Sequence, residues 1–222
     1  NKHAGMIYAS NLCHEIAQNV GFTNLAEEII NEDGTITTKT NTGDMVTCNL
    51  NSISLGRITD EELEENIALQ IRMLDNVISI NQAPVPESRM TSDKYRAIGL
   101  GTSGYHHYLV NHDIQWESDE HIEVADKLFE NIAFYAIKAS MELAKEKGAY
   151  PAFKGSEWET GEYFTRRGYT SDRWKQLAAD VAKYGIRNGY LMAVAPTGST
   201  SNIANTTAGI DPIFKKFFIE EK

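Results

Sequence analysis

Segments in which apolar residues recur at helical spacing alternate along this chain with short apolar runs typical of β-strands. The clearest helical segment begins at Thr59 and Glu62, which match a capping box, and it extends over about five turns before Pro84. Its apolar stripe consists of Leu63, Ile67, Ile71, Leu74 and Ile78. Two further helices are expected, over 118–147 and 172–184, and each is followed by a glycine that can end it.

Short strand-like runs lie before, between and after these helices. Strands are expected over 5–17 (running into a loop), 26–40 (a hairpin turning at Asp33-Gly34), 45–55, 96–100 and 189–195. This alternation predicts a mixed α/β fold, with about half of the strands that a closed barrel needs. No linker, repeat or low-complexity tract interrupts residues 1–222, so we expect them to form a single domain.

The composition excludes several classes of function. The chain has 222 residues, with 31 acidic and 21 basic side chains and a net charge of −10, whereas binding a nucleic-acid backbone requires a basic face. No apolar run approaches the roughly 18–20 residues of a membrane-spanning helix, and no signal-peptide pattern opens the chain. We therefore expect no nucleic-acid partner and no membrane association. Because the chain begins with Asn1 rather than Met, we also expect a processed chain or a piece of a longer one.

Cys13 and Cys48 are the only cysteines, so we expect no disulfide framework of the secreted type. They are either a thiol pair of a reducing compartment or two unrelated buried thiols, because a lone cysteine usually packs as a small hydrophobic residue. Zinc is not expected, since there is no CxxC pair and no histidine pair at ligand spacing. The adjacent His106 and His107 point in different directions and do not converge on one metal.

Polar side chains surround the first cysteine. On an extended chain Asn11, Cys13 and Glu15 share one face, because alternate residues of a strand point the same way. An amide can hold a hydroxyl, a carboxylate can take its proton, and a sulfur can attack or carry a radical. The same spacing also describes a strand with one buried cysteine and two solvated polar residues, and the local pattern alone favours that simpler interpretation.

Two later segments can likewise be explained either as part of a functional site or as ordinary structure. In Cys48-Asn49-Leu50-Asn51-Ser52 the thiol either faces the first strand and forms a reversible pair or lies in the core, which the local pattern favours. Pro196-Thr197-Gly198-Ser199-Thr200-Ser201 combines hydroxyls, a glycine and the N–H groups of a helix start, which is typical of an anion cradle. It lacks the lysine of a nucleoside-triphosphate P-loop, and a hydroxyl-rich helix cap explains the segment equally well.

A glycine pattern raises a different function. Gly99-Leu100-Gly101-Thr102-Ser103-Gly104 matches the G-x-G-x-x-G pattern of dinucleotide-binding sites. It lies behind a helix in mid-chain, and the acidic strand end expected about twenty residues later is replaced by a helix start at 117–120. Close packing of a strand against a helix at these glycines is therefore favoured. An oxidoreductase that binds NAD(P) at 99–104 stays an alternative.

Taken together, these motifs resemble the large (alpha) subunit of class I ribonucleotide reductase in both order and spacing. The matching segments are Ala9-Ser10-Asn11-Leu12-Cys13-His14-Glu15-Ile16, Cys48-Asn49-Leu50 before Ser52, Arg96–Gly101, Ala195–Ser201 and Gly209-Ile210-Asp211-Pro212. The resemblance runs from end to end, but it covers only the later part of a longer family chain. Coenzyme B12-dependent (class II) relatives share the pattern and usually flank the cysteine with Pro and Gly, so Leu12 and His14 favour class I.

The resemblance implies part of a ten-stranded α/β barrel with Cys13 on a catalytic finger loop near the N-terminus. Cys13 then corresponds to the thiyl radical that takes the 3′-hydrogen of a ribonucleoside diphosphate. Glu15 corresponds to the base for the 3′-hydroxyl, Asn11 to the amide that binds the ribose hydroxyls, and Ser10 lies beside the substrate. Cys48 corresponds to one member of the reducing thiol pair, and 196–201 to the loop that holds the substrate phosphates.

The resemblance also implies partners. No cofactor is expected in this chain, because the radical comes from a metal-containing beta subunit, or from adenosylcobalamin in class II. A thioredoxin- or glutaredoxin-type reductant and the rest of the alpha chain are the other expected partners, since the second redox cysteine, the allosteric sites, the radical-passing tyrosines and the tail cysteines all lie outside 1–222. Alone, the chain is expected to bind nucleotide or a partner subunit without turnover. A redox thiol pair requires a reducing compartment, so we expect the cytoplasm.

Overall fold

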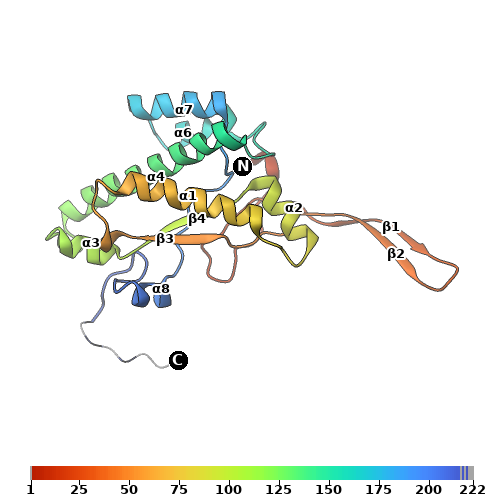
Figure 1. Cartoon of the computed structure of the whole chain (residues 1–222), viewed down its shortest axis with the longest axis horizontal. Coiled ribbons are helices and arrows are strands. Elements are labelled where there is room, and N and C mark those ends of the chain that lie inside the picture. The colour runs from red at the N-terminus through yellow and green to blue at the C-terminus, as the bar shows by residue number, and fades with distance from the viewer. Residues whose placement is uncertain (1, 216, 218, 220–222) are drawn as a thin grey trace.

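The computed structural model describes residues 2–215, 217 and 219 and has a mixed α/β body from which one hairpin projects (Figure 1). The strands are β1 (Asn24–Ile30), β2 (Ile36–Asn41), β3 (Leu50–Ser54) and β4 (Gly99–Ser103). The helices are α1 (Leu63–Ile80), α2 (Pro86–Tyr95), α3 (Tyr105–Asn111), α4 (Asp119–Lys147), α5 (Glu157–Thr160), α6 (Glu162–Arg166), α7 (Asp172–Tyr184) and α8 (Gly198–Ile203). Short 3₁₀ helices cover Lys2–Ala4 and Leu55–Arg57. No helix of the described residues is both long and apolar enough to cross a membrane.

The central sheet is short and parallel. β3 pairs with β4 from Leu50↔Gly99 to Ser54↔Ser103, and α1 and α2 connect the two strands. The segment 190–193 runs along the other edge of β4, where Leu100 N–H donates to Leu191 O (2.7 Å) and Ala193 N–H to Leu100 O (3.1 Å). Only one isolated bridge forms there, so the expected strand over 189–195 is extended chain rather than a regular strand. The described residues therefore form an open sheet and no closed barrel.

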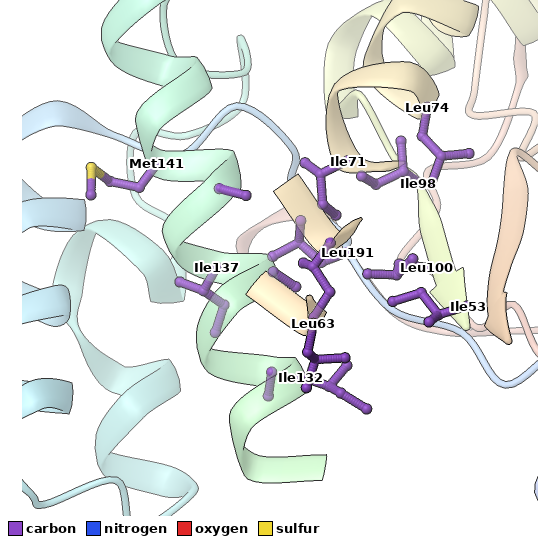
Figure 2. Packing of buried hydrophobic residues seen from close by; sticks show 14 of the residues in the cluster. Ile53, Leu63, Ile71, Leu74, Ile98, Leu100, Ile132, Ile137, Met141 and Leu191 are labelled. Carbon is purple, nitrogen blue, oxygen red and sulfur yellow. The ribbon is translucent and has the colours of Figure 1, made fainter. Parts of the chain in front are cut away.

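The hydrophobic core lies between this sheet and the two longest helices. α1 and α4 pack side by side above β3 and β4, with α7 beyond α4 and α8 on the opposite side of the sheet (Figure 1). Figure 2 shows Leu63 and Ile71 of α1 between Ile132 of α4 and Leu100 of β4. The predicted apolar stripe of α1 is confirmed, since its first four members are at most 4% exposed and Ile78 is partly buried.

The predicted helix boundaries follow from capping groups. The Ser118 hydroxyl accepts a hydrogen bond from His121 N–H (3.1 Å) at the start of α4, and Gly148 follows its end with φ +84°. Half of the expected capping box forms, because the Glu62 carboxylate accepts from Thr59 N–H (2.9 Å), but regular helix begins only at Leu63. Helix α2 is not expected from the sequence pattern. It begins at a proline, which is tolerated there because the first N–H of a helix has no partner within the helix.

Besides the strand over 189–195, three strand predictions require correction. Residues 5–17 contain no regular strand, and only an isolated bridge between Met6 and Val20 forms near them. The strand expected over 45–55 is confined to Leu50–Ser54. The strand expected over 96–100 lies over Gly99–Ser103, because Arg96 ends α2 in the left-handed conformation (φ 45°). The sequence pattern predicts no regular structure over 149–170, but this region contains the short helices α5 and α6.

The predicted hairpin is confirmed, and it leaves the body. β1 and β2 pair antiparallel through a turn at Asp33-Gly34, where Gly34 has φ +83°. Every residue of both strands is exposed, and Figure 1 shows the hairpin extending away from the helices. Leu25 and Ile30 lie in the open, at 62% and 79% exposure.

A buried carboxylate connects four separate parts of the body. Asp75 of α1 is fully buried and accepts hydrogen bonds from Arg96 Nε (2.6 Å) and Arg187 Nε (3.2 Å). Asn188 Nδ2 (3.3 Å) and Lys147 Nζ (3.4 Å) also approach it. Burial alone would raise the pKa of Asp75, but the hydrogen bond and charge of Arg96, with the charges of Arg187 and Lys147, hold it below its usual range.

We expect Asp75→Asn to lower the free energy of unfolding by about 3–5 kcal/mol, because Arg96 and Arg187 would lose their anion while staying largely buried. Urea unfolding measures the loss. The control is Glu64→Gln, which removes an exposed ion pair with Lys138 (2.6 Å) and should shift the unfolding midpoint far less. An equal loss in both variants would contradict this role of Asp75.

The same network predicts a dependence on pH. Because the pKa of Asp75 is lower in the folded than in the unfolded chain, its carboxylate stabilises the fold fully at neutral pH. That contribution is lost as the pH falls below about 4 and through the lowered value. The stability difference between the native chain and Asp75→Asn, measured by urea unfolding from pH 7 to 3, should therefore shrink in acid. A difference that does not change with pH would contradict the expectation.

Candidate active site

The segment around Cys13 is a tight turn and not the extended strand assumed from the alternation of its residues. His14 N–H donates to Asn11 O (3.1 Å), and Ile16 N–H donates to the side-chain oxygen of Asn11 (2.9 Å). His14 adopts a left-handed conformation (φ 65°), and its Nδ1 lies 2.8 Å from the Ser10 hydroxyl. The turn places Cys13 at its exposed outer end.

The side-chain amide of Asn11 makes hydrogen bonds to a backbone N–H, a carboxylate and a thiol. Since its oxygen accepts from Ile16 N–H, its nitrogen must point the other way. That nitrogen donates to Glu15 Oε1 (2.6 Å) and to Cys48 Sγ (3.4 Å). The turn therefore brings together Asn11, Glu15 and the second cysteine, which comes from a distant part of the chain.

Glu15 has one oxygen without a partner. Its Oε1 accepts from Asn11, whereas its Oε2 is buried and has no hydrogen-bond partner among the described residues. A buried polar atom is normally paired, so an unpaired carboxylate oxygen is an available acceptor for the hydroxyl of a bound molecule.

Neither cysteine is buried, although the local sequence pattern favours a buried position for both. Cys13 and Cys48 are free thiols and both are exposed, so the expectation that they are buried hydrophobic residues is wrong. Cys48 lies just before β3, outside the strand in which it was expected. In the described part of the chain, no group of three or more His, Cys, Asp or Glu side chains could hold a metal ion.

The predicted cradle lies at the start of α8, which begins at Gly198 after Thr197. Two of its hydroxyls make local bonds, since Thr200 donates to Thr197 O (3.2 Å) and Ser201 to Gly198 O (3.0 Å). The cradle also opens into a cavity of about 1060 Å³. The lining is Pro196, Thr197, Gly198, Ser199, Thr200, Ser201, Asn202, Thr206, Thr207, Ala208, Asp211, Pro212, Ile213, Phe214 and Lys215. The segment is thus both a helix start and one wall of a cavity.

Sequence reasoning about the cradle missed the opposite wall of this cavity. The loop 206–215 returns to the cradle, where Gly209 N–H donates to the Thr197 hydroxyl (2.8 Å). Gly104 N–H at the end of β4 donates to Thr207 O (2.7 Å) and fixes the same loop. The only signal in the sequence was the Gly209–Pro212 motif, which was noted for its resemblance and not for its position.

The glycine pattern 99–104 forms β4 itself rather than a phosphate-binding loop. A Cβ added at Gly99 would lie 2.3 Å from the Leu50 side chain, and one at Gly101 would lie 2.4 Å from Ala193 O. The glycines thus allow close approach of neighbouring extended chains, whereas the sequence analysis expected a helix as their packing partner. Ile16, at the end of the Cys13 turn, also reaches the Gly99 position (3.7 Å).

The described residues thus combine a parallel β3–β4 unit, the turn of Asn11 and a cavity beside α8. The chain matches the family model described as "Ribonucleotide reductase, barrel domain" over residues 1–222, and it belongs to this family. It therefore contributes to the ribonucleotide reductase barrel, although the described residues do not close one.

Three relatives from different bacteria share one name. The chain is 54% identical over 228 residues to "Ribonucleoside-diphosphate reductase subunit alpha" of Treponema pallidum (strain Nichols), covering 100% of this chain and 27% of the relative. It is 37% identical to the subunit of the same name from Helicobacter pylori (strain J99 / ATCC 700824), covering 100% of this chain and 34% of the relative. A Chlamydia pneumoniae subunit of that name is 34% identical over 98% of this chain and 21% of its own length. The chain thus spans about a fifth to a third of these relatives.

The close contact at Gly101 generates a prediction. We expect Gly101→Ala to cost about 1–3 kcal/mol of stability, because its Cβ would displace the backbone at Ala193. Gly198→Ala is the matched control, since a Cβ there meets nothing within 4 Å. Thermal unfolding of both variants measures the difference. A Gly101→Ala chain as stable as the Gly198→Ala chain would show that β4 and 190–193 do not need this close approach.

Proposed function

We propose that the chain supplies part of the active site of a ribonucleoside-diphosphate reductase, which makes 2′-deoxyribonucleotides for DNA synthesis. The observation that carries the proposal is the Asn11 amide, which donates to both Glu15 (2.6 Å) and Cys48 (3.4 Å). A base, an amide and a thiol are held together in or beside the turn of the exposed Cys13. The relatives' names state the same activity. We further propose that residues 1–222 form a single domain.

We assign the radical step to Cys13. As a thiyl radical its sulfur takes the hydrogen atom from C3′, so an S–H bond forms, a C–H bond breaks, and the unpaired electron passes to C3′. Glu15 takes the 3′-hydroxyl proton through its unpaired Oε2, while Asn11 binds the ribose hydroxyls. Ser10, held by His14, lies beside the substrate in this arrangement.

Cys48 serves the reduction itself. The 2′-hydroxyl takes a thiol proton and leaves as water, which breaks the C2′–O bond. A dithiol formed by Cys48 and a cysteine outside this chain supplies that proton, the second hydrogen and two electrons, so a C2′–H bond forms and the two sulfurs join in a disulfide. Glu15 returns its proton to the 3′-oxygen. Cys13 then returns its hydrogen atom to C3′ and is a radical again. The exposure of both thiols supports this exchange, because each must be reached by other groups.

The substrate phosphates are assigned to the cavity beside α8. The backbone N–H groups at the start of α8 and the hydroxyls of Thr197 and Ser199 line this cavity and are donors for an anion. Such a site suits a small phosphorylated substrate. The radical is assigned to a metal-containing beta subunit, with adenosylcobalamin in its place if the protein is class II. A thioredoxin- or glutaredoxin-type reductant re-reduces the thiols, and the cytoplasm provides the reducing setting.

The test is Cys13→Ser and Glu15→Gln in the intact protein, assayed with its radical-generating partner for conversion of ribonucleoside diphosphates. We expect no turnover from Cys13→Ser, because a serine hydroxyl does not replace the thiol as hydrogen-atom carrier. We expect Glu15→Gln to lose about 10²–10⁴-fold in kcat, since it removes the proton acceptor. The control Glu28→Gln, on the exposed β1 strand, should retain full activity. Full activity of Cys13→Ser, with an unchanged fold, would refute the assignment.

A further inference from the structure

The chain between the two cysteines leaves the body as the β1–β2 hairpin and returns at its starting point (Figure 1). The two ends of this excursion meet at Gly21 and Asp44, where Asp44 N–H donates to Gly21 O (2.9 Å). Gly43 completes the junction, because a Cβ there would lie 2.4 Å from Gly21 O. Cys48 follows Asp44 by four residues, so the junction lies close to the thiol along the chain.

The Asp44 side chain closes the junction from the other direction. It is 6% exposed, and its Oδ2 accepts from Gly21 N–H (2.9 Å) and from the Tyr95 hydroxyl (3.1 Å). Lys94 Nζ donates to its Oδ1 (3.0 Å) and balances its charge. Burial raises the pKa of the Tyr95 hydroxyl above its usual value. One carboxylate of the outgoing chain therefore binds both the incoming chain and the end of α2.

Two tyrosines relate this junction to the Cys13 side. Tyr95, which holds Asp44, packs edge-on against Tyr190 with ring centres 6.1 Å apart. The Tyr190 hydroxyl donates to the Asn19 side chain (2.9 Å) and accepts from Asn19 N–H (3.1 Å). The segment that follows Cys13 is thus hydrogen-bonded to Tyr190 through Asn19, and the segment that precedes Cys48 is hydrogen-bonded to Tyr95 through Asp44. The rings of these two tyrosines pack against each other.

The segment from Asp44 to Cys48 is held along α2 by further bonds. Met45 N–H donates to the Thr91 hydroxyl (2.8 Å), and the Thr47 and Ser92 hydroxyls lie 3.3 Å apart. These bonds involve neutral groups, whereas the Asp44 carboxylate takes charge-assisted ones, which are the stronger kind. The junction at Asp44 is therefore the strongest point at which this segment is fixed upstream of Cys48.

We propose that Asp44 is a positioning residue that sets the place of the Cys48 thiol relative to the Asn11–Glu15 turn. It touches no reacting atom and acts through Gly21, Tyr95 and the segment up to Cys48. Its consequence for catalysis rests on the proposed reductase function. Its consequence for the geometry does not, which allows the two to be tested apart.

The geometric test places nitroxide labels on Cys13 and Cys48 of the full chain, with any cysteine outside residues 1–222 replaced by Ala. Dipolar broadening of the electron paramagnetic resonance spectrum reports the separation of the labels. We expect Asp44→Ala to weaken the broadening and to speed hydrogen exchange at Met45 N–H about tenfold or more. Tyr95→Phe should change both in the same direction by less, and Asp44→Asn should recover part of the loss because one oxygen remains for Gly21.

The matched control is Asp33→Ala at the far tip of the hairpin, which removes the same side chain from an exposed turn. We expect it to change neither readout. If Asp44→Ala leaves both readouts within twofold of the native chain, or if Asp33→Ala changes them as much, the positioning role is refuted. Should Asp44→Ala fail to fold, Tyr95→Phe decides by the same criteria.

Turnover separates this inference from the proposed function. In the intact protein we expect Asp44→Ala to lower kcat about tenfold to a hundredfold, with the KM for ribonucleoside diphosphate unchanged, since the thiol is misplaced and the substrate site is not. An unchanged kcat, or a rise in KM alone, would contradict the inference while leaving the function standing. Altered label and exchange readouts in a protein without reductase activity would refute the function and support the positioning role.

Discussion

The buried charge of Asp75 is the interaction on which the arrangement of the body depends. One carboxylate of α1 receives Arg96 from the end of α2, Lys147 from the end of α4, and Arg187 and Asn188 from the chain that enters 190–193. Arg96 directly precedes β4 in the chain, and Arg187 and Asn188 directly precede the segment 190–193 that lies along it. Because a buried anion without donors is costly, an arrangement that separated these segments from Asp75 would be destabilised.

The glycines of β4 make the second half of that arrangement. Arg187 and Asn188, which bind Asp75, place the segment 190–193 at the edge of β4. Because Gly99 and Gly101 have no side chains, this segment comes close enough for hydrogen bonds between the two backbones. At one end of this strand lies the Cys13 turn, through Ile16, and at the other the loop 206–215, through Gly104. The candidate thiol site and the candidate phosphate cavity are therefore arranged along a single short strand.

The three longest helices, α1, α4 and α7, were predictable because their signals are local, whereas the shorter α2, α3, α5 and α6 were not expected. The stripe of α1 and the caps at Ser118 and Gly148 depend on residues within a few positions of each other, so the sequence is sufficient. The strands depend on distant partners, and so the expected strand over 5–17 was wrong. The side chain of Asn11 satisfies the Ile16 backbone and turns the chain, which alternation of residue types cannot reveal. The same turn unites Asn11, Glu15 and Cys48, a contact across a long stretch of chain that no spacing rule anticipates.

The hairpin of β1 and β2 stands apart from the core, and its ends are fastened together at Gly21 and Asp44. A projection closed at its base is a module whose size is independent of the body that carries it. The tip at Asp33-Gly34 can therefore gain or lose residues without a change in the hydrophobic packing, as exposed turns generally can. A tag or reporter domain inserted at this tip would therefore leave the core packing in place.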